Sequence, residues 1–283
     1  MKKGSLFQRL AAAPHILWAI MFIVFPMIFV LFFAFTDADG NFSFSNITSL
    51  SQYGHVFVLS IAFALIATVV CLIIGYPLAY FMSKQSPRAQ KMLMVLVMLP
   101  MWCNLLIRTY ALMALLDNGG LLNSLLESLG LDKIQIVGTN FGVILGMIYD
   151  FLPYMVLPIF TAMTKLDPKF IEASQDLGCT TWQTMTRVIM PLTASGVISG
   201  VTMVFVPSIS TFYISQKLGA GKIDLVGDTI ERLFQNPSTY NVGAAVSLIM
   251  MVLIIISVGI MNRFSDDKTP SDSKGGKGGG LVP

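Results

Sequence analysis

A polar stretch, DPKFIEASQDLGCTTWQTMTRVIMP (residues 167–191), lies between two long apolar segments of this chain. Asp167 is a good N-cap, and Pro168 suits the first position of a helix. Gly178 follows ten residues later and is a natural C′ stop. Thr180 then begins a second helix, with a glutamine three residues on that completes a capping box. The stretch therefore predicts a short helix, a tight turn and a second helix.

The first of these helices carries an apolar stripe. Phe170, Ser174 and Leu177 follow at i, i+4 and i+7, so they share one helical face. Such a pattern suits a groove on another protein. A surface helix of a membrane protein has no use for an apolar face unless something covers it. We therefore expect a partner protein to grip this helix.

The composition of the whole chain identifies the class of protein. Of 283 residues, 55% are hydrophobic and 12% are charged, whereas soluble domains average roughly 45–50% and about 25%. A membrane span needs about 20 mostly apolar residues. Six segments qualify, at residues 14–36, 56–83, 92–116, 141–164, 188–215 and 242–261. The sequence thus predicts an all-α integral membrane protein with six transmembrane helices.

The distribution of Lys and Arg between the connections predicts the orientation, because cytoplasmic loops carry the excess. One side, which holds both termini and the loop 165–191, carries eleven of these residues up to Lys268, and the other side carries four. Both termini and this loop are therefore expected in the cytoplasm. The net charge of +3 reflects this anchoring and does not indicate nucleic-acid binding.

The two ends differ from the spans. Leu6, Phe7 and Leu10 lie on one side of a short helix near basic residues, which predicts an interfacial helix before the first span. After residue 264 the chain becomes polar, and residues 275–283 resemble an expression linker. We expect one transmembrane domain over residues 1–264 and a disordered tail over 265–283.

Polar residues inside the spans are the candidates for function. Asp150 lies near the middle of the fourth span, where a carboxylate is costly and by default functional. Tyr154 follows one turn later on the same face, and the third span carries Asn104 and Arg108 beside Trp102. Three interpretations stay open: Asp150 pairs with Arg108, it lines the path of a cationic solute, or it is protonated and hydrogen-bonded.

Prolines interrupt most of the spans. Each removes a backbone hydrogen bond and tends to kink its helix, and broken helices are tolerated where the backbone lines a cavity or packs on protein. The segment from Pro207 to Tyr213 is polar enough to face a pathway, although packing through small residues would explain it equally well. The prolines within spans are Pro26, Pro77, Pro100, Pro153, Pro158 and Pro207.

The polar stretch resembles the EAA loop of ABC-importer permeases. Glu172, Ala173, Gly178 and Pro191 stand at that family's spacing, and Ser174 in place of alanine is a mild departure. The resemblance implies the type I ABC-importer permease architecture and a cytoplasmic coupling loop over residues 165–191. It assigns coupling to an ATPase to Phe170, Glu172, Ala173, Leu177 and Gly178.

Three further blocks, at residues 99–110, 152–158 and 210–215, resemble the spermidine/putrescine permeases. The similarity is strongest to the first of the two permease subunits of such importers, and it extends to Arg263. Carboxylates and aromatic faces hold a flexible polycation through ion pairs and cation–π contacts. The candidate substrate pathway therefore comprises Trp102, Asn104, Arg108, Tyr149, Asp150, Tyr154, Phe212 and Tyr213.

The chain shows no nucleotide-binding motif of its own. The string at residues 219–222, GAGK, lacks the glycine spacing of a Walker A loop and the Ser or Thr that follows it. We expect no catalytic site, metal or cofactor. The family resemblance implies two cytoplasmic ATPase subunits, a second homologous permease and an extracytoplasmic binding protein as partners, in the lipid bilayer of a bacterial inner membrane.

The sequence thus predicts the permease subunit of an ATP-driven importer that moves polyamines into the cell by alternating access. One alternative is a permease for another small solute in the same importer class. A second is an ion-coupled secondary transporter with Asp150 as a relay, but no inverted repeat is evident and the polar stretch would then have no purpose. A membrane anchor without transport would leave Asp150 and the prolines unexplained.

Overall fold

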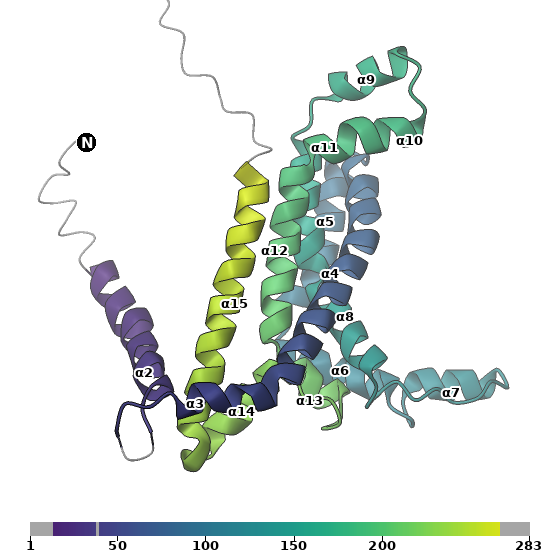
Figure 1. The fold of residues 1–283 in the computed structure, drawn as a ribbon. Helices are drawn as coiled ribbons and strands as arrows, with labels where there is room; N and C mark the ends of the chain where they lie inside the picture. The colour runs from purple at the N-terminus through teal and green to yellow at the C-terminus, as the bar shows by residue number, and fades with distance from the viewer. Residues whose placement is uncertain (1–13, 38–39, 267–283) are drawn as a thin grey trace, which may run out of the picture. The chain divides into compact units, whose positions relative to one another are not determined.

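The computed structural model describes residues 14–37 and 40–266, and over these residues the chain is almost entirely helical (Figure 1). The described part of the chain has no strand beyond an isolated bridge between Thr36 and Phe42. The expected interfacial helix around Leu6 and the tail after residue 266 lie outside the described residues. The all-α class is confirmed.

Most of the expected spans are present as long apolar helices. A sixth span arises if the bent pair Thr181–Leu192 and Ala194–Ser210, whose axes differ by 69°, is counted as one. The other five stretches that are long and apolar enough to cross a membrane are Pro14–Ala34, Ser45–Ser83, Leu105–Ser128, Asn140–Thr164 and Pro237–Arg263.

The expected third span, 92–116, is not one helix, and that prediction is wrong. α5 (Pro87–Trp102) ends just before Cys103, and α6 (Leu105–Leu116) begins anew at Asn104. The side chain of Asn104 accepts a hydrogen bond from the Leu106 N–H at 2.8 Å, with Asn104 itself in an extended conformation. This is N-cap geometry, which starts a new helix.

The expected fifth span, 188–215, is also interrupted. A π-helical turn (η3, Met185–Ile189) and α11 (Met190–Leu192) precede Thr193, and α12 (Ala194–Ser210) follows it. The Thr193 hydroxyl donates to the Ile189 carbonyl at 2.8 Å. Threonine bonds of this kind and π turns are recognised causes of bent helices. A second break, after Ser210, precedes α13 (Tyr213–Leu218).

The chain divides into two compact units, each built from separate pieces of sequence. The first comprises the described parts of Met1–Ala67, Cys103–Asp150 and Phe205–Ile256, and the second those of Thr68–Trp102, Phe151–Val204 and Ser257–Pro283.

The remaining elements are η1 (Ile20–Val24), α2 (Phe25–Ala34), α3 (Ser45–Thr48), η2 (Ser49–Tyr53), α4 (Gly54–Ser83), α7 (Leu121–Ser128), α8 (Asn140–Thr164), α9 (Pro168–Asp176), α10 (Thr181–Thr184), α14 (Val226–Gln235), η4 (Pro237–Thr239) and α15 (Tyr240–Asp266).

Small residues let the helices of the second unit approach closely. A Cβ placed on Gly196 would lie 2.6 Å from the Ala162 Cβ, and one on Gly200 would lie 2.9 Å from the Met155 sulfur. A Cβ placed on Gly75 of α4 would lie 3.1 Å from the Cγ of the same methionine. Close backbone approach at small residues is how helices associate in lipid, where no hydrophobic effect drives them together.

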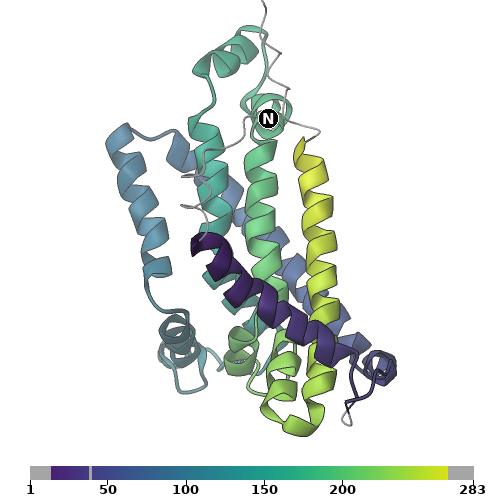
Figure 2. The same ribbon diagram turned by 90° about the vertical axis from the view of Figure 1, so that its left-hand side faces the viewer.

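The first unit is held by polar contacts between distant segments. The Val226 N–H at the start of α14 donates to the Ser60 hydroxyl of α4 at 2.8 Å. The Asn241 amide of α15 donates to the Thr36 carbonyl at 2.8 Å. α14 leads through η4 directly into α15 (Figure 2). The connection between the last two spans therefore packs against α4 within the first unit.

Candidate functional site

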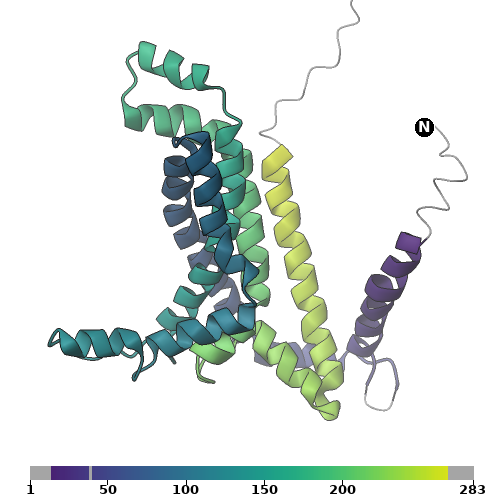
Figure 3. The same cartoon turned by 180° about the vertical axis from the view of Figure 1, so that it is seen from behind.

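The local signals that predict α9 all act in the structure. The Asp167 carboxylate accepts from the Lys169 N–H at 3.0 Å, so Asp167 is the N-cap. Thr180 caps α10, with a reciprocal hydrogen bond between its own N–H and the Gln183 side chain at 2.9 Å. α9 and α10 lie beside each other across a short turn (Figures 1 and 3). The predicted helix–turn–helix is confirmed.

The turn after α9 depends on a glycine. Gly178 has a φ of +78°, a conformation that L side chains rarely adopt. Its N–H donates to the Gln175 carbonyl at 2.9 Å, and the Cys179 N–H donates to the Ser174 carbonyl at 3.0 Å. These two bonds form a Schellman motif. The direction in which the chain leaves α9 is thus set by the backbone at residue 178.

The apolar face of α9 is partly as expected. Phe170 and Leu177 are 53% and 85% exposed, and Glu172 and Ala173 are also exposed. Ser174, which we placed on the same face, is only 5% exposed, and its hydroxyl lies 3.0 Å from that of Thr184 on α10. Its assignment to the outer face is wrong, because it joins the two helices of the loop.

Trp182 extends the exposed apolar surface beyond α9. This α10 side chain is 74% exposed in the chain by itself. The sequence analysis missed it, although its position two residues after the N-cap Thr180 placed it in the first turn of a helix in a polar loop. Phe170, Leu177 and Trp182 are the large apolar side chains that residues 168–184 expose, and we call these three side chains the coupling face.

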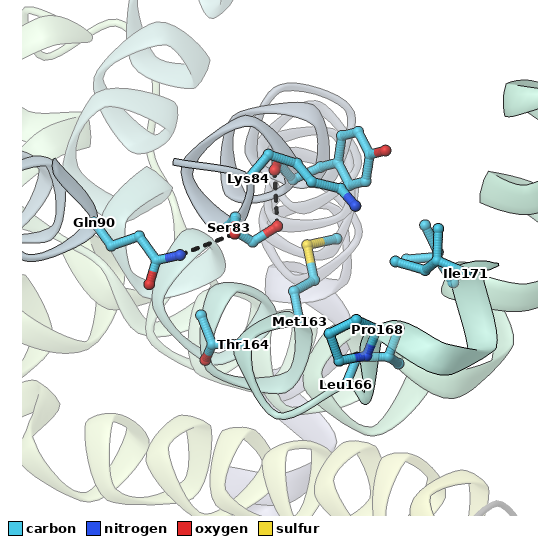
Figure 4. A pocket seen from close by; sticks show the side chains of 10 residues that line it. Ser83, Lys84, Gln90, Met163, Thr164, Leu166, Pro168 and Ile171 are labelled. Atoms are coloured by element: carbon cyan, nitrogen blue, oxygen red, sulfur yellow. Dashed lines mark hydrogen bonds between the residues drawn. The ribbon is translucent and has the colours of Figure 1, made fainter. Parts of the chain in front are cut away.

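A cavity of about 300 Å³ lies beneath α9 within the second unit. Figure 4 shows Lys84 and Gln90 on the side of the α4–α5 turn, with Met163 at the end of α8 and Ile171 on α9. The Gln90 amide donates to the Ser83 carbonyl at 2.9 Å, which ties α5 to α4. α9 thus lines this cavity together with the ends of α4, α5 and α8.

The intramembrane carboxylate of the first unit has an internal partner. The Arg108 guanidinium forms a salt bridge with Asp150, and the two side chains are 7% and 0% exposed. The Thr109 hydroxyl also approaches Asp150, at 3.4 Å from Oδ2. The ring centre of Tyr149 lies 5.9 Å from the guanidinium carbon. Of the three interpretations of Asp150, the ion pair is the one that this conformation adopts.

The other pathway candidates have separate environments. Asn104 caps α6, so its position has a structural explanation, and Trp102 is 73% exposed at the end of α5. Tyr154 contacts Phe151, with ring centres 6.3 Å apart, and Phe212 is exposed.

Tyr213 belongs to a cluster that the sequence analysis did not find. Its ring lies 5.9 Å from that of Tyr110, and the Lys217 ammonium lies 5.1 Å from the Tyr110 ring centre and 5.6 Å from that of Tyr213. This is cation–π geometry. The i, i+4 spacing of Tyr213 and Lys217 was a usable signal, but Tyr110 is brought to them only by the fold.

A second buried carboxylate, Asp228, was also missed. It is 5% exposed on the first turn of α14, and its Oδ2 accepts from the Leu225 N–H at 3.0 Å. Burial raises the pKa of Asp228 to about 6, against the opposing effect of hydrogen bonds from Ser215 and Leu225. The sequence signal was an acidic residue in the first turn of a helix, which is common and not specific.

Comparison with known proteins decides the family. The model of the family described as "Binding-protein-dependent transport system inner membrane component" matches residues 72–269, a range that contains α9 and the turn at Gly178. The chain belongs to this family. As a member, it is a multi-pass protein of the bacterial inner membrane and a translocation component of a transport system that depends on a binding protein.

Similarity to named members of this family extends over nearly the whole chain. It is 38% identical to the spermidine/putrescine transport system permease protein PotB of Haemophilus influenzae, over 91% of this chain and 93% of that protein. It is 36% identical to PotB of Escherichia coli K12, over 84% and 90%. A bacterial alginate ABC transporter, in complex with a periplasmic protein bound to an alginate pentasaccharide, contains a chain of the same fold, with a TM-score of 0.74, 20% identity and coverage of 92% and 94%.

Proposed function

We propose that this family member is the permease subunit of an ATP-driven importer that carries spermidine and putrescine into the cell. The observation that carries this proposal is the 38% identity to a spermidine/putrescine permease over 91% of the chain. The proposed partners are two cytoplasmic ATPase subunits, a second homologous permease and an extracytoplasmic binding protein. The chain would supply half of the translocation path and the surface that receives the force.

The coupling face supports the proposed contact with an ATPase. Three large apolar side chains are exposed here, Phe170 and Leu177 between the candidate spans and Trp182 at the start of the bent pair Thr181–Leu192 and Ala194–Ser210. Exposed apolar clusters of this kind mark interaction sites. Closure of the two ATPase subunits on ATP would move α9 and, through the cavity-lining contacts, the ends of α4, α5 and α8. The permease would thereby alternate between outward-open and inward-open states.

A role for Asp150 in the path of a polycation would require it to exchange its present partner. A carboxylate in the membrane interior needs a cationic partner, and here Arg108 supplies one. A substrate ammonium that reaches Asp150 would compete with Arg108 for the same oxygen atoms. Substrate would then bind best in a conformation in which this pair is loosened, so that binding favours that conformation.

The proposal is tested by reconstituting the chain with its three kinds of partner in proteoliposomes and measuring uptake of radiolabelled spermidine. We expect uptake that requires ATP and the binding protein. Uptake of a different small solute in place of polyamines would keep the importer class and overturn the substrate. Uptake driven by an ion gradient without ATP would favour the secondary transporter.

The proposed orientation has its own test. In a variant that retains Cys179 as its only cysteine, a membrane-impermeant maleimide should label inside-out vesicles and spare intact cells. The ATPase should slow this labelling, since Cys179 lies immediately after the turn at Gly178. Labelling of intact cells would overturn the cytoplasmic placement of α9 and of both termini.

A further inference from the structure

The first unit contains a cavity of about 470 Å³. Of the candidate pathway residues, only Phe212 lines it. It lies between the end of α12, α14 and α15. Cavities of about this size hold small organic ligands. Its lining includes Ser210, Phe212, Glu231, Ser247, Met250 and Ile254.

The single charged group in this lining is the Glu231 carboxylate. Its hydrogen-bond partners are neutral amides, those of Gln216 and Gln235. The nearest cation in sequence, Arg232, forms an ion pair with Asp224 at 2.7 Å. None of the ion pairs among residues 14–37 and 40–266 includes Glu231. The cavity therefore presents a negative charge that the described structure leaves without a cationic partner.

The first turn of α14 does not reverse this charge. A helix N-terminus is positive, and Gly227 at the start of α14 also lines the cavity. However, two N–H groups there are already used, that of Val226 by the Ser60 hydroxyl and that of Leu225 by the Asp228 carboxylate. Asp228 also lies one turn before Glu231 on the same helix. Of these two carboxylates only Glu231 lines the cavity, and it favours a cation there.

The rest of the lining selects the kind of cation. A bare divalent ion needs six or more oxygen ligands, largely carboxylates, and no cluster of three His, Cys, Asp or Glu exists in the part of the chain that the structure describes. The aromatic ring of Phe212, the thioether of Met250 and the alkyl chain of Ile254 instead suit methylene groups and the face-on approach of an ammonium. A lipid tail would leave the carboxylate unpaired.

We propose that this cavity is a binding subsite for one end of a polyamine, with an ammonium at Glu231 and a methylene segment along Met250 and Ile254. The inference rests on the proposed transport of polyamines and adds a location for the substrate. The cavity extends from the connection between the last two spans, which lies opposite to α9 in the expected topology, along α15 as far as Ile255. The subsite would thus receive the polycation on its way from the binding protein to the membrane interior.

The test uses the complete importer in proteoliposomes and compares two isosteric changes. Glu231→Gln removes the cavity charge, and Glu127→Gln is the matched control. Glu127 is an exposed carboxylate on α7, paired with Lys133 at 3.2 Å and outside the cavity. We expect spermidine uptake at low substrate concentration to fall at least tenfold in Glu231→Gln and to stay within twofold of wild type in the control. Phe212→Leu should fall about threefold, and Glu231→Asp should keep more uptake than Glu231→Gln.

A second measurement examines binding without depending on a Glu231 variant that folds. Ser247→Cys, in a protein without the three native cysteines, places a thiol in the cavity wall. Spermidine should slow the modification of this thiol by a cationic methanethiosulfonate reagent at least fivefold. The neutral polyol sorbitol should not slow it.

The outcomes separate the subsite from the proposed function. Wild-type uptake of spermidine with equal rates for Glu231→Gln and Glu127→Gln overturns the subsite and leaves the function standing. If spermidine does not protect the thiol of the Ser247→Cys variant in an importer that transports spermidine, the conclusion is the same. An importer that transports no polyamine overturns both.

Discussion

Two regions of this chain break the usual burial pattern in opposite ways. They are the coupling face on α9 and α10 and the buried Arg108–Asp150 pair. The first exposes Phe170, Leu177 and Trp182, apolar side chains on a polar loop. The second buries two charges inside an apolar unit. Both are unfavourable for a chain in isolation, since exposed apolar surface and buried charge each cost free energy.

The two regions resolve this cost in different ways. Arg108 and Asp150 are each other's partner within the chain, so each charge offsets the burial cost of the other. The apolar side chains of the coupling face find no partner among the described residues that covers them, so we infer one from outside. An uncovered apolar face thus indicates an interface, whereas the buried Arg108–Asp150 pair needs no partner from outside the chain. The following experiments test this difference between the two regions.

The largest effect is expected from splitting the ion pair. Either Arg108→Gln or Asp150→Asn leaves one buried charge without its partner, which typically costs about 3–5 kcal/mol. The double variant should recover most of the loss in melting temperature of the detergent-solubilised complex. Single variants as stable as wild type would contradict an internal partner. If the stable double variant takes up spermidine at the wild-type rate, Asp150 is not in the pathway.

Asp228 is a buried carboxylate without a cationic partner in any ion pair of the described residues, so it sharpens the contrast with Asp150. Its pKa of about 6 lies above the ordinary 3.8. The folded state therefore holds the proton more tightly, and this stabilisation is full below pH 4 and lost as the pH rises through 6. Over that window wild type should lose about 2–3 kcal/mol relative to Asp228→Asn.

Melting curves of the two proteins between pH 4 and pH 8 measure this difference. The amide that Asp228→Asn introduces stays neutral and keeps an acceptor for the Leu225 N–H. The gap between the two proteins should therefore open as the pH rises through 6. Parallel pH profiles would show that the burial of Asp228 is relieved in the assembled complex.

The turn at Gly178 tests whether the placement of the coupling face matters. Gly178→Val forces a β-branched residue into a φ of +78°, at a cost of about 1–3 kcal/mol. A Cβ at residue 178 meets nothing within 4 Å, so any effect comes from the backbone. Gly259→Val is the matched control, because Gly259 has equal space and no positive φ.

We expect normal membrane levels for both glycine variants. Substrate-stimulated ATP hydrolysis should fall at least tenfold in Gly178→Val alone. Full stimulation in Gly178→Val would mean that the direction of the chain after α9 is not part of the coupling.

A smaller effect is expected from single changes on the coupling face itself. Leu177→Ser removes one exposed apolar contact and should weaken ATPase association by about tenfold, or about 1.4 kcal/mol. The melting temperature of the permease should not change, because Leu177 is 85% exposed. Leu121→Ser on α7, at 76% exposure, is the control and should leave association unchanged. Equal affinities for the two variants would remove Leu177 from the interface.

A change at Ser174 tests the internal packing of the loop separately from its outer face. Ser174→Ala removes the contact with the Thr184 hydroxyl and should destabilise the helix–turn–helix by about 1 kcal/mol. It should not alter the affinity of an intact loop for the ATPase. The measurement is hydrogen exchange over residues 168–190 together with ATPase binding.

The coupling loop was predictable in detail because its determinants are local. Asp167 bonds to Lys169, Thr180 exchanges bonds with Gln183, and Gly178 closes the turn onto Gln175. Each of these contacts joins residues at most three positions apart. Contacts between residues so close in the chain can be predicted from the sequence alone. The apolar length of the spans is likewise a property of consecutive residues, so the membrane class needed no structure.

The errors and omissions share a different origin. The sequence predicted kinks at the prolines of the third and fifth spans, but the helices end instead near Asn104 and Thr193. Both residues were visible, yet a polar side chain in a span can cap a helix, bend it or bond to another helix. Only its surroundings select among these, so the break points were not readable from hydropathy.

By itself the sequence determined the all-helical membrane class, the helix–turn–helix of α9 and α10 and the charge and aromatic residues available for a pathway. Tertiary structure alone decided that Asp150 pairs with Arg108, that Ser174 faces Thr184, that Lys217 lies over Tyr110, and that Glu231 lines a cavity. The physical reason is the range of the interactions. Capping bonds and apolar runs act between chain neighbours, whereas an ion pair or a cavity depends on which distant segments pack together.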